Sequence, residues 1–270
     1  MVQMTEDISQ WQPLLATVWP GLEVQAIAST ASTNTWAREH RDALSGHTTL
    51  AITDRQTAGR GSGTNHWESQ DGCNLTFSLC LHPMGLRANR MFALSEAMSL
   101  GVAIGLEQAV RDLADSTDAA FTVKWPNDIY HQDGKICGML IENDLSGRLV
   151  ERSVIGVGIN VRQTRFLSDA PNPTSLSLVA GRDFPRVEVL ARVLSCFRNC
   201  LYWLEHGEYD ILHEQYMSRV YRLREWHRYA GQGGTFEGMI RDIQPDGHLV
   251  LADRMGTERK YAFGEVKYII

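Results

Sequence analysis

The spacing of hydrophobic and polar residues predicts a mixture of helices and strands up to Met217. Apolar residues recur every three or four positions between Arg90 and Asp112, which predicts a long core helix. The same spacing predicts further helices over residues 35–40, 187–205 and 209–217. Period-two alternation and short apolar runs predict strands over residues 22–28, 48–54, 74–81, 121–125, 129–131 and 135–143, and a pair of strands within 149–161.

The pattern changes at Arg224. From there, short alternating segments over residues 234–243, 248–252 and 258–263 are separated by turn residues. This spacing predicts a small β-barrel of about 45 residues that forms a separate unit. We therefore expect two domains, residues 1–223 and 224–270, with residues 1–21 as an N-terminal extension without an assigned role.

Composition narrows the class of protein. The chain has 270 residues, 43% of them hydrophobic, and a net charge of −6, which argues against a dedicated nucleic-acid-binding protein. It shows neither a signal peptide nor an apolar run of about 18 residues, so we expect a cytoplasmic protein outside the membrane. The five cysteines form no CxxC pair, and Cys196 and Cys200 share one helix face, where core packing is the favoured interpretation over metal binding.

Candidate chemistry is densest between Val123 and Asn143. The cluster Lys124-Trp125-Pro126-Asn127-Asp128 is followed by Gly134-Lys135 and by an apolar run that closes on Glu142. Lysines neutralise phosphates and carboxylates, and Asp128 is suited to Mg²⁺ held with phosphate. This combination is what acyl-adenylate chemistry requires. Two plainer interpretations stay open, a solvated hairpin residue for Lys135 and a turn residue for Asp128.

Two glycine-rich segments can approach a ligand closely. The loop from Ala58 to Trp67 has three glycines around Arg60 and Ser62, which suits an anion, although a flexible surface loop is an equal alternative. Residues 156–160 read Gly-Val-Gly-Ile-Asn without the third glycine of a dinucleotide fingerprint. We interpret them as a strand whose glycines make room for a ligand, with Asn160 donating hydrogen bonds.

The histidines and tryptophans of these segments have two interpretations each. Trp67 and Trp125 could face a purine, but a single tryptophan more often belongs to the core. His66 and His131 are interpreted as packing or surface residues rather than ligands.

The order of these motifs resembles the biotin–protein ligase (biotin–[acetyl-CoA-carboxylase] ligase) family, and the resemblance covers most of the chain from about Val24 onward. The matching segments are Ser32-Thr33-Asn34, Gln56 with Ala58-Gly59-Arg60-Gly61 and Trp67, Lys124-Trp125-Pro126-Asn127-Asp128, Gly134-Lys135 with Gly138, Leu140 and Glu142, and the segment 156–160. The resemblance implies a mixed sheet with helices, an α+β catalytic domain, followed by an SH3-like barrel.

The resemblance also implies a reaction and its residues. Biotin and ATP with Mg²⁺ would give biotinyl-5′-AMP, and the biotin would pass to a lysine of a biotin carboxyl carrier protein of acetyl-CoA carboxylase or a related carboxylase. The implied biotin site is Ser32, Thr33, Asn34, Gln56, Arg60, Gly61, Ser62, Lys135, Gly138 and Leu140. The implied ATP site is Trp67, Lys124, Asn127, Asp128, Asn160 and Glu265, with Lys135, Arg60 and Asp128 as catalytic residues and Asp128 as the Mg²⁺ ligand.

Three departures from the family pattern change the expectations. Ser62 stands where the family often has a second arginine, so we expect weaker retention of biotinyl-AMP unless Arg55 or Arg60 compensates. About 25 residues precede the first catalytic strand, too few for a DNA-binding domain of about 60 residues, so we expect a monofunctional ligase, monomeric or homodimeric, without DNA as a partner. Ile269 stands where some members have an arginine.

Three rival functions stay open at this point. A lipoate–protein ligase also activates its substrate as an acyl-adenylate. A non-catalytic biotin-responsive regulator is the other alternative, because Ser62 in place of the arginine could weaken or abolish catalysis. A nicotinamide oxidoreductase would rest only on residues 156–160.

Overall fold

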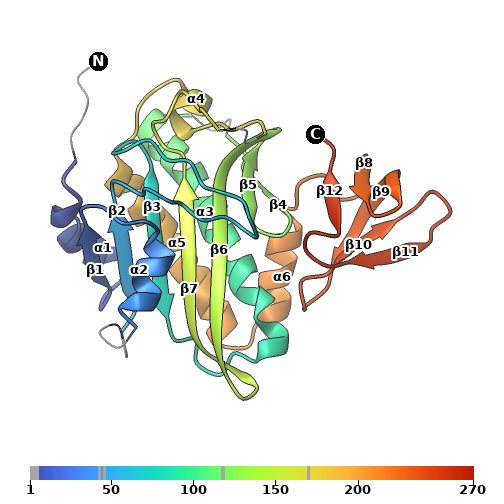
Figure 1. Ribbon diagram of the computed structural model, residues 1–270, viewed down its shortest axis with the longest axis horizontal. Coiled ribbons are helices and arrows are strands. Elements are labelled where there is room, and N and C mark those ends of the chain that lie inside the picture. The colour runs from blue at the N-terminus through green and yellow to red at the C-terminus, as the bar shows by residue number, and fades with distance from the viewer. Residues whose placement is uncertain (1–5, 42–43, 45–46, 117–118, 169–170) are drawn as a thin grey trace.

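The computed structural model of the chain describes all residues except 1–5, 42–43, 45–46, 117–118 and 169–170. They form a seven-stranded mixed sheet covered by helices and, beside it, a five-stranded antiparallel sheet at the C-terminal end (Figure 1). The predicted fold class, a mixed sheet packed with helices and followed by a small β unit, is confirmed.

The large sheet has the spatial order β1-β2-β3-β7-β6-β5-β4. Its strands are β1 Glu23–Ile27, β2 Thr49–Thr53, β3 Leu75–Leu81, β4 Thr122–Lys124, β5 Asp128–His131, β6 Gly134–Ser146 and β7 Leu149–Ile159. Strands β1 and β2 are parallel, and the other neighbours are antiparallel. Every residue of β2 and β3 is buried, which is expected of strands that are covered on both faces.

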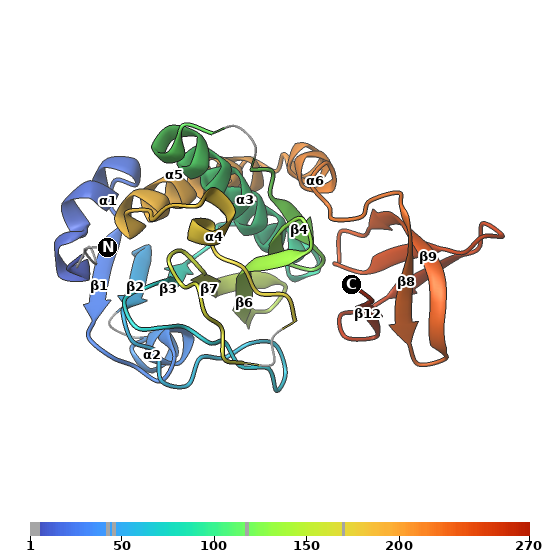
Figure 2. The same ribbon diagram turned by 90° about the horizontal axis from the view of Figure 1, so that it is seen from above.

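Helices cover both faces of this sheet. They are η1 Ile8–Gln10, α1 Gln12–Val18, α2 Thr33–Glu39, η2 Ala88–Arg90, α3 Phe92–Ala114, α4 Leu176–Ala180, α5 Arg186–Glu205 and α6 Tyr209–Met217. Figure 2 shows α1, α3 and α5 on one face and α2 on the other. Helices α3 and α5 approach closely because Gly101 and Gly105 lack a Cβ, which would lie 2.6 Å from the backbone of Phe197 and of Val193.

The small sheet has the order β11-β10-β9-β8-β12. Its strands are β8 Trp226–Gly231, β9 Gly234–Ile243, β10 Leu249–Ala252, β11 Glu258–Tyr261 and β12 Val266–Tyr268. It is attached to the rest of the molecule where the indole of Trp125 donates a 2.9 Å hydrogen bond to the carbonyl of Gly247. The domain boundary at Arg224 lies between α6 and β8 and stays a prediction.

Sequence patterns misread some elements. The strand pair within residues 149–161 is wrong, because β7 is one continuous strand that pairs with β3 on one side and β6 on the other. Its alternation breaks at Gly156 and Gly158, which mimics a turn. The short helices α1 and α4 and the strands β8 and β12 were not predicted. The first of these helices, α1, lies in the N-terminal extension and packs on α5.

Two predictions concern burial. All five cysteines are free and buried, so the interpretation of Cys196 and Cys200 as core residues is confirmed. Burial raises the pKa of the Cys200 thiol to about 12. Within the part of the chain that the structure describes, no helix combines the length and the apolar character needed to cross a bilayer.

Candidate functional site

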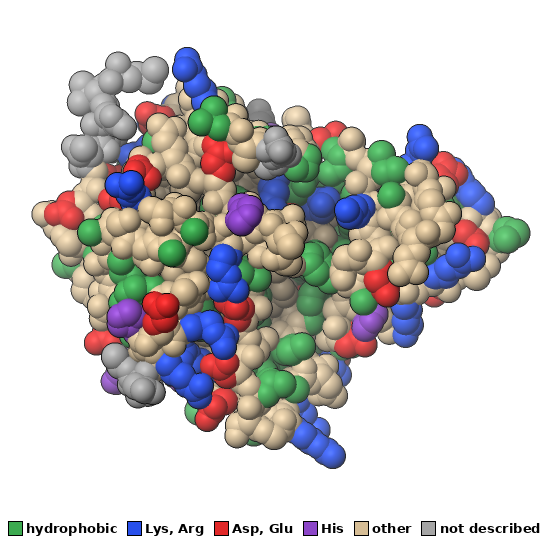
Figure 3. All heavy atoms as spheres, viewed as in Figure 1, with side chains coloured by type: hydrophobic (Ala, Val, Ile, Leu, Met, Phe, Trp, Pro, Cys, Tyr) green, Lys and Arg blue, Asp and Glu red, His purple; other side chains and the backbone are tan. Residues whose placement is uncertain are grey.

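A cleft opens on the α2 face of the large sheet, and the space-filling view shows a hollow between this part of the molecule and the small sheet (Figure 3). Its empty volume, including solvent at its mouth, is about 760 Å³. The cleft is lined by Ser32, Thr33, Asn34, Gln56, Arg60, Gly61, Ser62, Asn65, His66, Trp67, Thr76, Pro126, Asn127, Asp128, Lys135, Gly138, Met139, Leu140, Gly156, Val157, Gly158 and Phe263. Thirteen of the sixteen predicted site residues therefore meet in one place.

The first end of the cleft is built by the start of α2 and is rich in hydroxyl and amide groups. The backbone N–H of Thr33 donates to Oε1 of Gln56 at 3.0 Å. The fully buried hydroxyl of Ser78 lies 2.6 Å from Oδ1 of Asn34 and 2.7 Å from Oγ1 of Thr33. The amide of Asn34 donates to the carbonyl of Leu140 at 3.1 Å. These bonds fix the groups that can hydrogen-bond a polar ligand.

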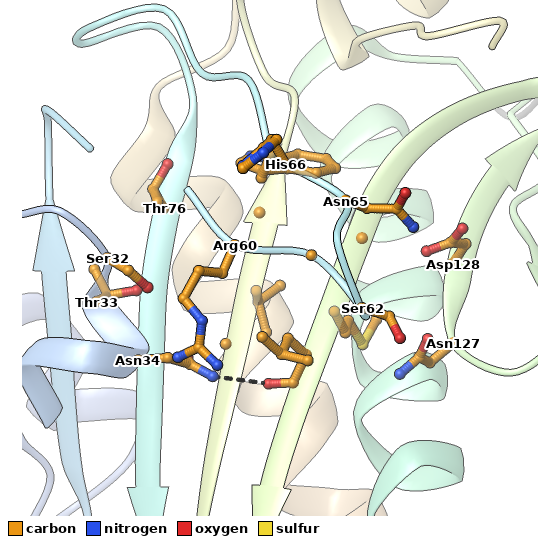
Figure 4. A pocket seen from close by; sticks show the side chains of 18 of the residues that line it. Ser32, Thr33, Asn34, Arg60, Ser62, Asn65, His66, Thr76, Asn127 and Asp128 are labelled. Carbon is orange, nitrogen blue, oxygen red and sulfur yellow. Dashed lines mark hydrogen bonds between the residues drawn. The ribbon is translucent and has the colours of Figure 1, made fainter. Parts of the chain in front are cut away.

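The glycine-rich loop spans the cleft as a small hairpin. Trp67 N–H donates to the carbonyl of Gly59 at 3.0 Å, and Gly61 N–H donates to that of Asn65 at 2.8 Å. Figure 4 shows the Arg60 side chain reaching toward Asn34, while Ser62 and Asn65 lie on the side of Asn127 and Asp128. The loop therefore contacts both ends of the cleft, which favours the ligand-binding interpretation over a plain surface loop.

The floor of the cleft consists of glycine backbone covered by side chains. Gly138 on β6 is the register partner of Gly158 on β7. A Cβ at Gly158 would overlap the indole of Trp67, and one at Gly138 would lie 2.9 Å from its Cζ3 atom. Likewise, a Cβ at Gly156 would overlap the amide of Asn34. The glycines therefore make room for Trp67 and Asn34, which themselves line the cleft, rather than for a ligand alone.

Lys135 and Asp128 mark the second end. The ammonium of Lys135 donates a 2.7 Å hydrogen bond to Oδ2 of Asp128, and both side chains are about three quarters buried. The same ammonium lies 5.8 Å from the centre of the Trp67 ring. Lys135 is thus a cleft residue and not a solvated hairpin residue, and it can exchange its carboxylate partner for an anionic ligand.

Three residues of the predicted ATP site lie outside the cleft lining. Lys124 is largely buried between the rings of Tyr130 and Tyr268, and burial lowers the pKa of its ammonium. The buried Asn160 donates to the carbonyl of Thr174 at 3.0 Å, as its predicted donor role requires, but toward the protein. Glu265 is exposed and accepts a bond from the N–H of Ala262. Their contact with ATP stays a prediction.

Several cleft residues were missed. His66 was interpreted as a packing or surface residue, yet it lines the cleft beside Asn65. Phe263 comes from the C-terminal part of the chain, and its ring lies 5.9 Å from that of Trp125. The supporting hydroxyl of Ser78 sits in a fully buried strand whose sequence resembles an ordinary core strand. Only the turn between β11 and β12, near the predicted Glu265, pointed to the Phe263 region.

The oxidoreductase interpretation is wrong. A dinucleotide site of that type needs a parallel strand–helix–strand unit. Strand β7, which carries the segment 156–160, is antiparallel to both β3 and β6. Its glycines meet side chains from other segments instead of a helix N-terminus.

Comparisons with known proteins agree with this geometry. The model of the biotin/lipoate A/B protein ligase family matches residues 26–160. The chain is 32% identical over 222 residues to the bifunctional ligase/repressor BirA of Bacillus subtilis, a match that covers 79% of this chain and 64% of BirA. It is 28% identical over 245 residues to a biotin–[acetyl-CoA-carboxylase] ligase of Paracoccus denitrificans, covering 86% and 95%.

A solved structure extends the likeness to the fold. The biotin protein ligase of Aquifex aeolicus in complex with biotin and ATP aligns with a TM-score of 0.70 at 25% identity. The alignment covers 92% of this chain and 99% of that one.

Proposed function

The chain belongs to the biotin/lipoate A/B protein ligase family, and from this premise we propose that it is a biotin–protein ligase. It activates biotin with ATP to biotinyl-5′-AMP and passes the biotin to a lysine of a biotin carboxyl carrier protein. The name of the Paracoccus relative and the ligands of the Aquifex structure support this choice within the family.

One observation carries the proposal: the cleft joins a neutral hydrogen-bonding end to a cationic end. Thr33, Asn34 and Gln56 offer hydroxyl and amide groups at the first end. These suit the ureido ring of biotin, which both donates and accepts hydrogen bonds. The dithiolane of lipoate has no such groups and would leave the buried polar atoms without partners, at a cost in binding.

The cationic end suits the activation step. The carboxylate of biotin attacks the α-phosphorus of ATP, and pyrophosphate leaves. The Lys135 ammonium, freed from Asp128, would contact the carboxylate and the α-phosphate and stabilise the negative charge that grows between them. The carrier amine then attacks the acyl carbon of the adenylate, and AMP leaves.

Mg²⁺ fits the same end as an ion that arrives with ATP. Magnesium is commonly bound by one or two carboxylates together with substrate phosphates. Asp128 and Asn127 line the cleft and offer oxygen ligands for it. When bound, the ion would neutralise phosphate charge.

Partner and location follow from the reaction. We infer a biotin carboxyl carrier protein of acetyl-CoA carboxylase, or of a related carboxylase, as the acceptor, because the Paracoccus relative is named for that activity. ATP and such a carrier meet in the cytoplasm, which is the location we propose.

Intact-mass analysis tests the proposal. A purified carrier domain is incubated with the protein, MgATP and either biotin or lipoate. We expect the mass increase of one biotin, dependent on ATP, and none with lipoate. A shift with lipoate alone would make the protein a lipoate ligase, and binding of biotin without any shift would favour a non-catalytic regulator.

A further inference from the structure

Glu142 lies on β6 and contacts two separate parts of the site. Its Oε1 accepts a 2.9 Å bond from Nη2 of Arg60, and its Oε2 accepts a 3.3 Å bond from Nη1 of the same guanidinium. Oε2 also accepts a 2.9 Å bond from the amide of Asn34. One carboxylate therefore joins the glycine-rich loop to the start of α2.

The two partners of Glu142 differ in how firmly they are held elsewhere. The Glu142 side chain is 21% exposed, whereas Arg60 is 43% exposed and belongs to a loop between β2 and β3. The other bond of the Arg60 guanidinium goes to the hydroxyl of Thr35 at 3.4 Å. Asn34 is buried and also bonded to Leu140 and Ser78. The Glu142 carboxylate thus connects a surface loop, a kind of segment that is usually mobile, to the firmly bonded start of α2.

The charge of Glu142 is maintained by these contacts. Burial alone would raise the pKa of its carboxyl group, but the hydrogen bonds from Arg60 and Asn34 hold that pKa below its ordinary value. The pair with Arg60 is bidentate and charge-assisted, the stronger form of such bonds. It persists over the neutral pH range.

Arg60 is the one arginine or lysine of this loop. Between Gln56 and Trp67, Arg60 is the single arginine or lysine, because Ser62 replaces the second arginine of the family pattern. The nearby Arg55 pairs with Asp71 at 3.6 Å and does not line the cleft. Arg60 therefore provides the ion pair between this loop and the sheet, beside the contact of the Lys135 ammonium with the Trp67 ring.

We propose that Glu142 is a positioning residue that holds the glycine-rich loop closed over the cleft through Arg60 and orients the amide of Asn34. It rests on the proposed function in one respect, since a closed loop would retain biotinyl-AMP between the two reaction steps. It acts through Arg60 and Asn34, and it does not line the cleft itself.

A matched control lies two residues further along β6. Asp144 also pairs with an arginine of the α2 segment, because its Oδ1 lies 3.4 Å from Nη2 of Arg38, but that arginine is outside the loop. Asp144→Asn removes the same charge from the same strand. Glu142→Gln weakens the pair with Arg60 and leaves an oxygen that can still accept a bond from Asn34.

The first test needs no substrate. Trypsin cleaves after arginine only when the chain around it opens, so the rate of cutting between Arg60 and Gly61 in the ligand-free protein reports loop opening. We expect Glu142→Gln to raise this rate about tenfold relative to the wild type, with Asp144→Asn unchanged. Equal rates in all three proteins would overturn the proposal, whatever the protein catalyses.

The second test follows biotinyl-AMP. In Glu142→Gln the adenylate should dissociate about tenfold faster, with KM for biotin raised and kcat of adenylate formation little changed, and Glu142→Asp should recover part of the retention. An equal loss of kcat in Glu142→Gln and Asp144→Asn would show general damage and reject positioning. If the wild type forms no adenylate, the proposed function fails while the trypsin result stands.

Discussion

At the scale of single residues, the site depends on charges that neutralise one another before any ligand arrives. Lys135 is paired with Asp128, and Arg60 is paired with Glu142. An anionic substrate at Lys135 must therefore replace Asp128 rather than meet a free cation, while the Arg60–Glu142 pair stays in place. Such an exchange costs little because one charge-assisted bond is formed for each that is lost.

Lys135→Ala should abolish adenylate formation. The change removes the cation that stabilises the transition state and leaves Asp128 unpaired, so we expect the rate of biotin-dependent ATP–pyrophosphate exchange to fall at least about 100-fold. Lys260→Ala, on the exposed strand β11, is the control and should keep the wild-type rate. A near-normal rate in Lys135→Ala would remove this residue from the mechanism.

Ser62→Arg should slow the release of biotinyl-AMP. Ser62 lies in the cleft near Asn127, and an arginine there would add a charge-assisted contact to the phosphate. We expect the dissociation rate, measured by displacement of labelled adenylate, to fall about tenfold. The neighbouring Gly63 has a positive φ of 64°, which favours glycine, so the substitution should be confined to position 62. An unaltered rate would mean that Arg60 already provides all of the retention.

Sequence reasoning was strongest at this scale where chemistry is concentrated. Lys135, Asp128 and Arg60 attracted notice because charged residues beside glycine and apolar runs are unusual, and all three line the cleft. Their roles in catalysis stay predictions. The role of Ser78 was not predictable, since a serine in a buried strand has many meanings until its neighbours in space are known. The link from Glu142 to Arg60 spans 82 positions, and no local pattern encodes such a pairing.

At the scale of elements, strands β6 and β7 form the floor of the cleft and determine how closely side chains can approach the sheet. The glycine pair Gly138 and Gly158 lets the Trp67 ring lie against the backbone. The buried indole N–H of Trp67 has no hydrogen-bond acceptor among the described residues. This edge of the ring faces the backbone of Gly158 and not the open part of the cleft.

Gly158→Ala should displace Trp67 and disturb the loop that carries it. Overpacking of this kind costs about 1–3 kcal/mol, so we expect a lower free energy of unfolding and a raised KM for biotin. Chemical denaturation and steady-state kinetics measure the two effects. Gly233→Ala, where a Cβ meets nothing within 4 Å, is the control. An unchanged KM would show that the position of Trp67 does not affect the loop residues assigned to biotin.

Helices were predicted well where the hydrophobic repeat continues over a long stretch of sequence. The helices α3 and α5 were recognised because apolar residues recur over several turns. Strand β7 was divided in two because glycines interrupted its alternation, and those glycines serve packing with Asn34 and Trp67 rather than a turn. Only the folded neighbours explain why the strand tolerates them.

At the scale of the whole molecule, a partly exposed polar contact connects the helices of the large sheet to the small sheet. His213 on α6 lies 2.7 Å from Oε1 of the buried Glu96 on α3 and 3.6 Å from Oδ1 of Asp242 on β9. The hydrogen bond that the imidazole makes to the Glu96 carboxylate raises the pKa of His213, and Asp242 adds to the effect. Burial raises the pKa of Glu96 as well.

This contact should make stability depend on pH. Because the folded pKa of His213 is raised, its contribution is full below the unfolded pKa of about 6.5 and is lost as the pH rises through the folded value. His213→Gln should therefore lower the free energy of unfolding by about 1 kcal/mol near pH 6 and by less near pH 8, measured by urea denaturation. The exposed His206→Gln is the control. A difference between wild type and His213→Gln that stays constant with pH would contradict the assignment.

The N-terminal extension shows what sequence could not supply at this scale. The backbone N–H and the guanidinium of Arg186 both donate to Glu6, and Arg162 donates to the same carboxylate at 2.9 Å. Arg186 is almost fully buried and also bonds Asp54. Four charged residues far apart along the chain form this contact, so no pattern within residues 1–21 could have revealed it.

The bond between the Trp125 indole and the Gly247 carbonyl has a consequence for protein engineering. Gly247 has a positive φ of 91°, and a Cβ there would lie 2.8 Å from the ring of Phe92. A chimera that imports the small sheet of a relative would have to import a turn with the same backbone shape. Such a chimera should therefore take both the turn that contains Gly247 and the residue at position 125 from the same relative.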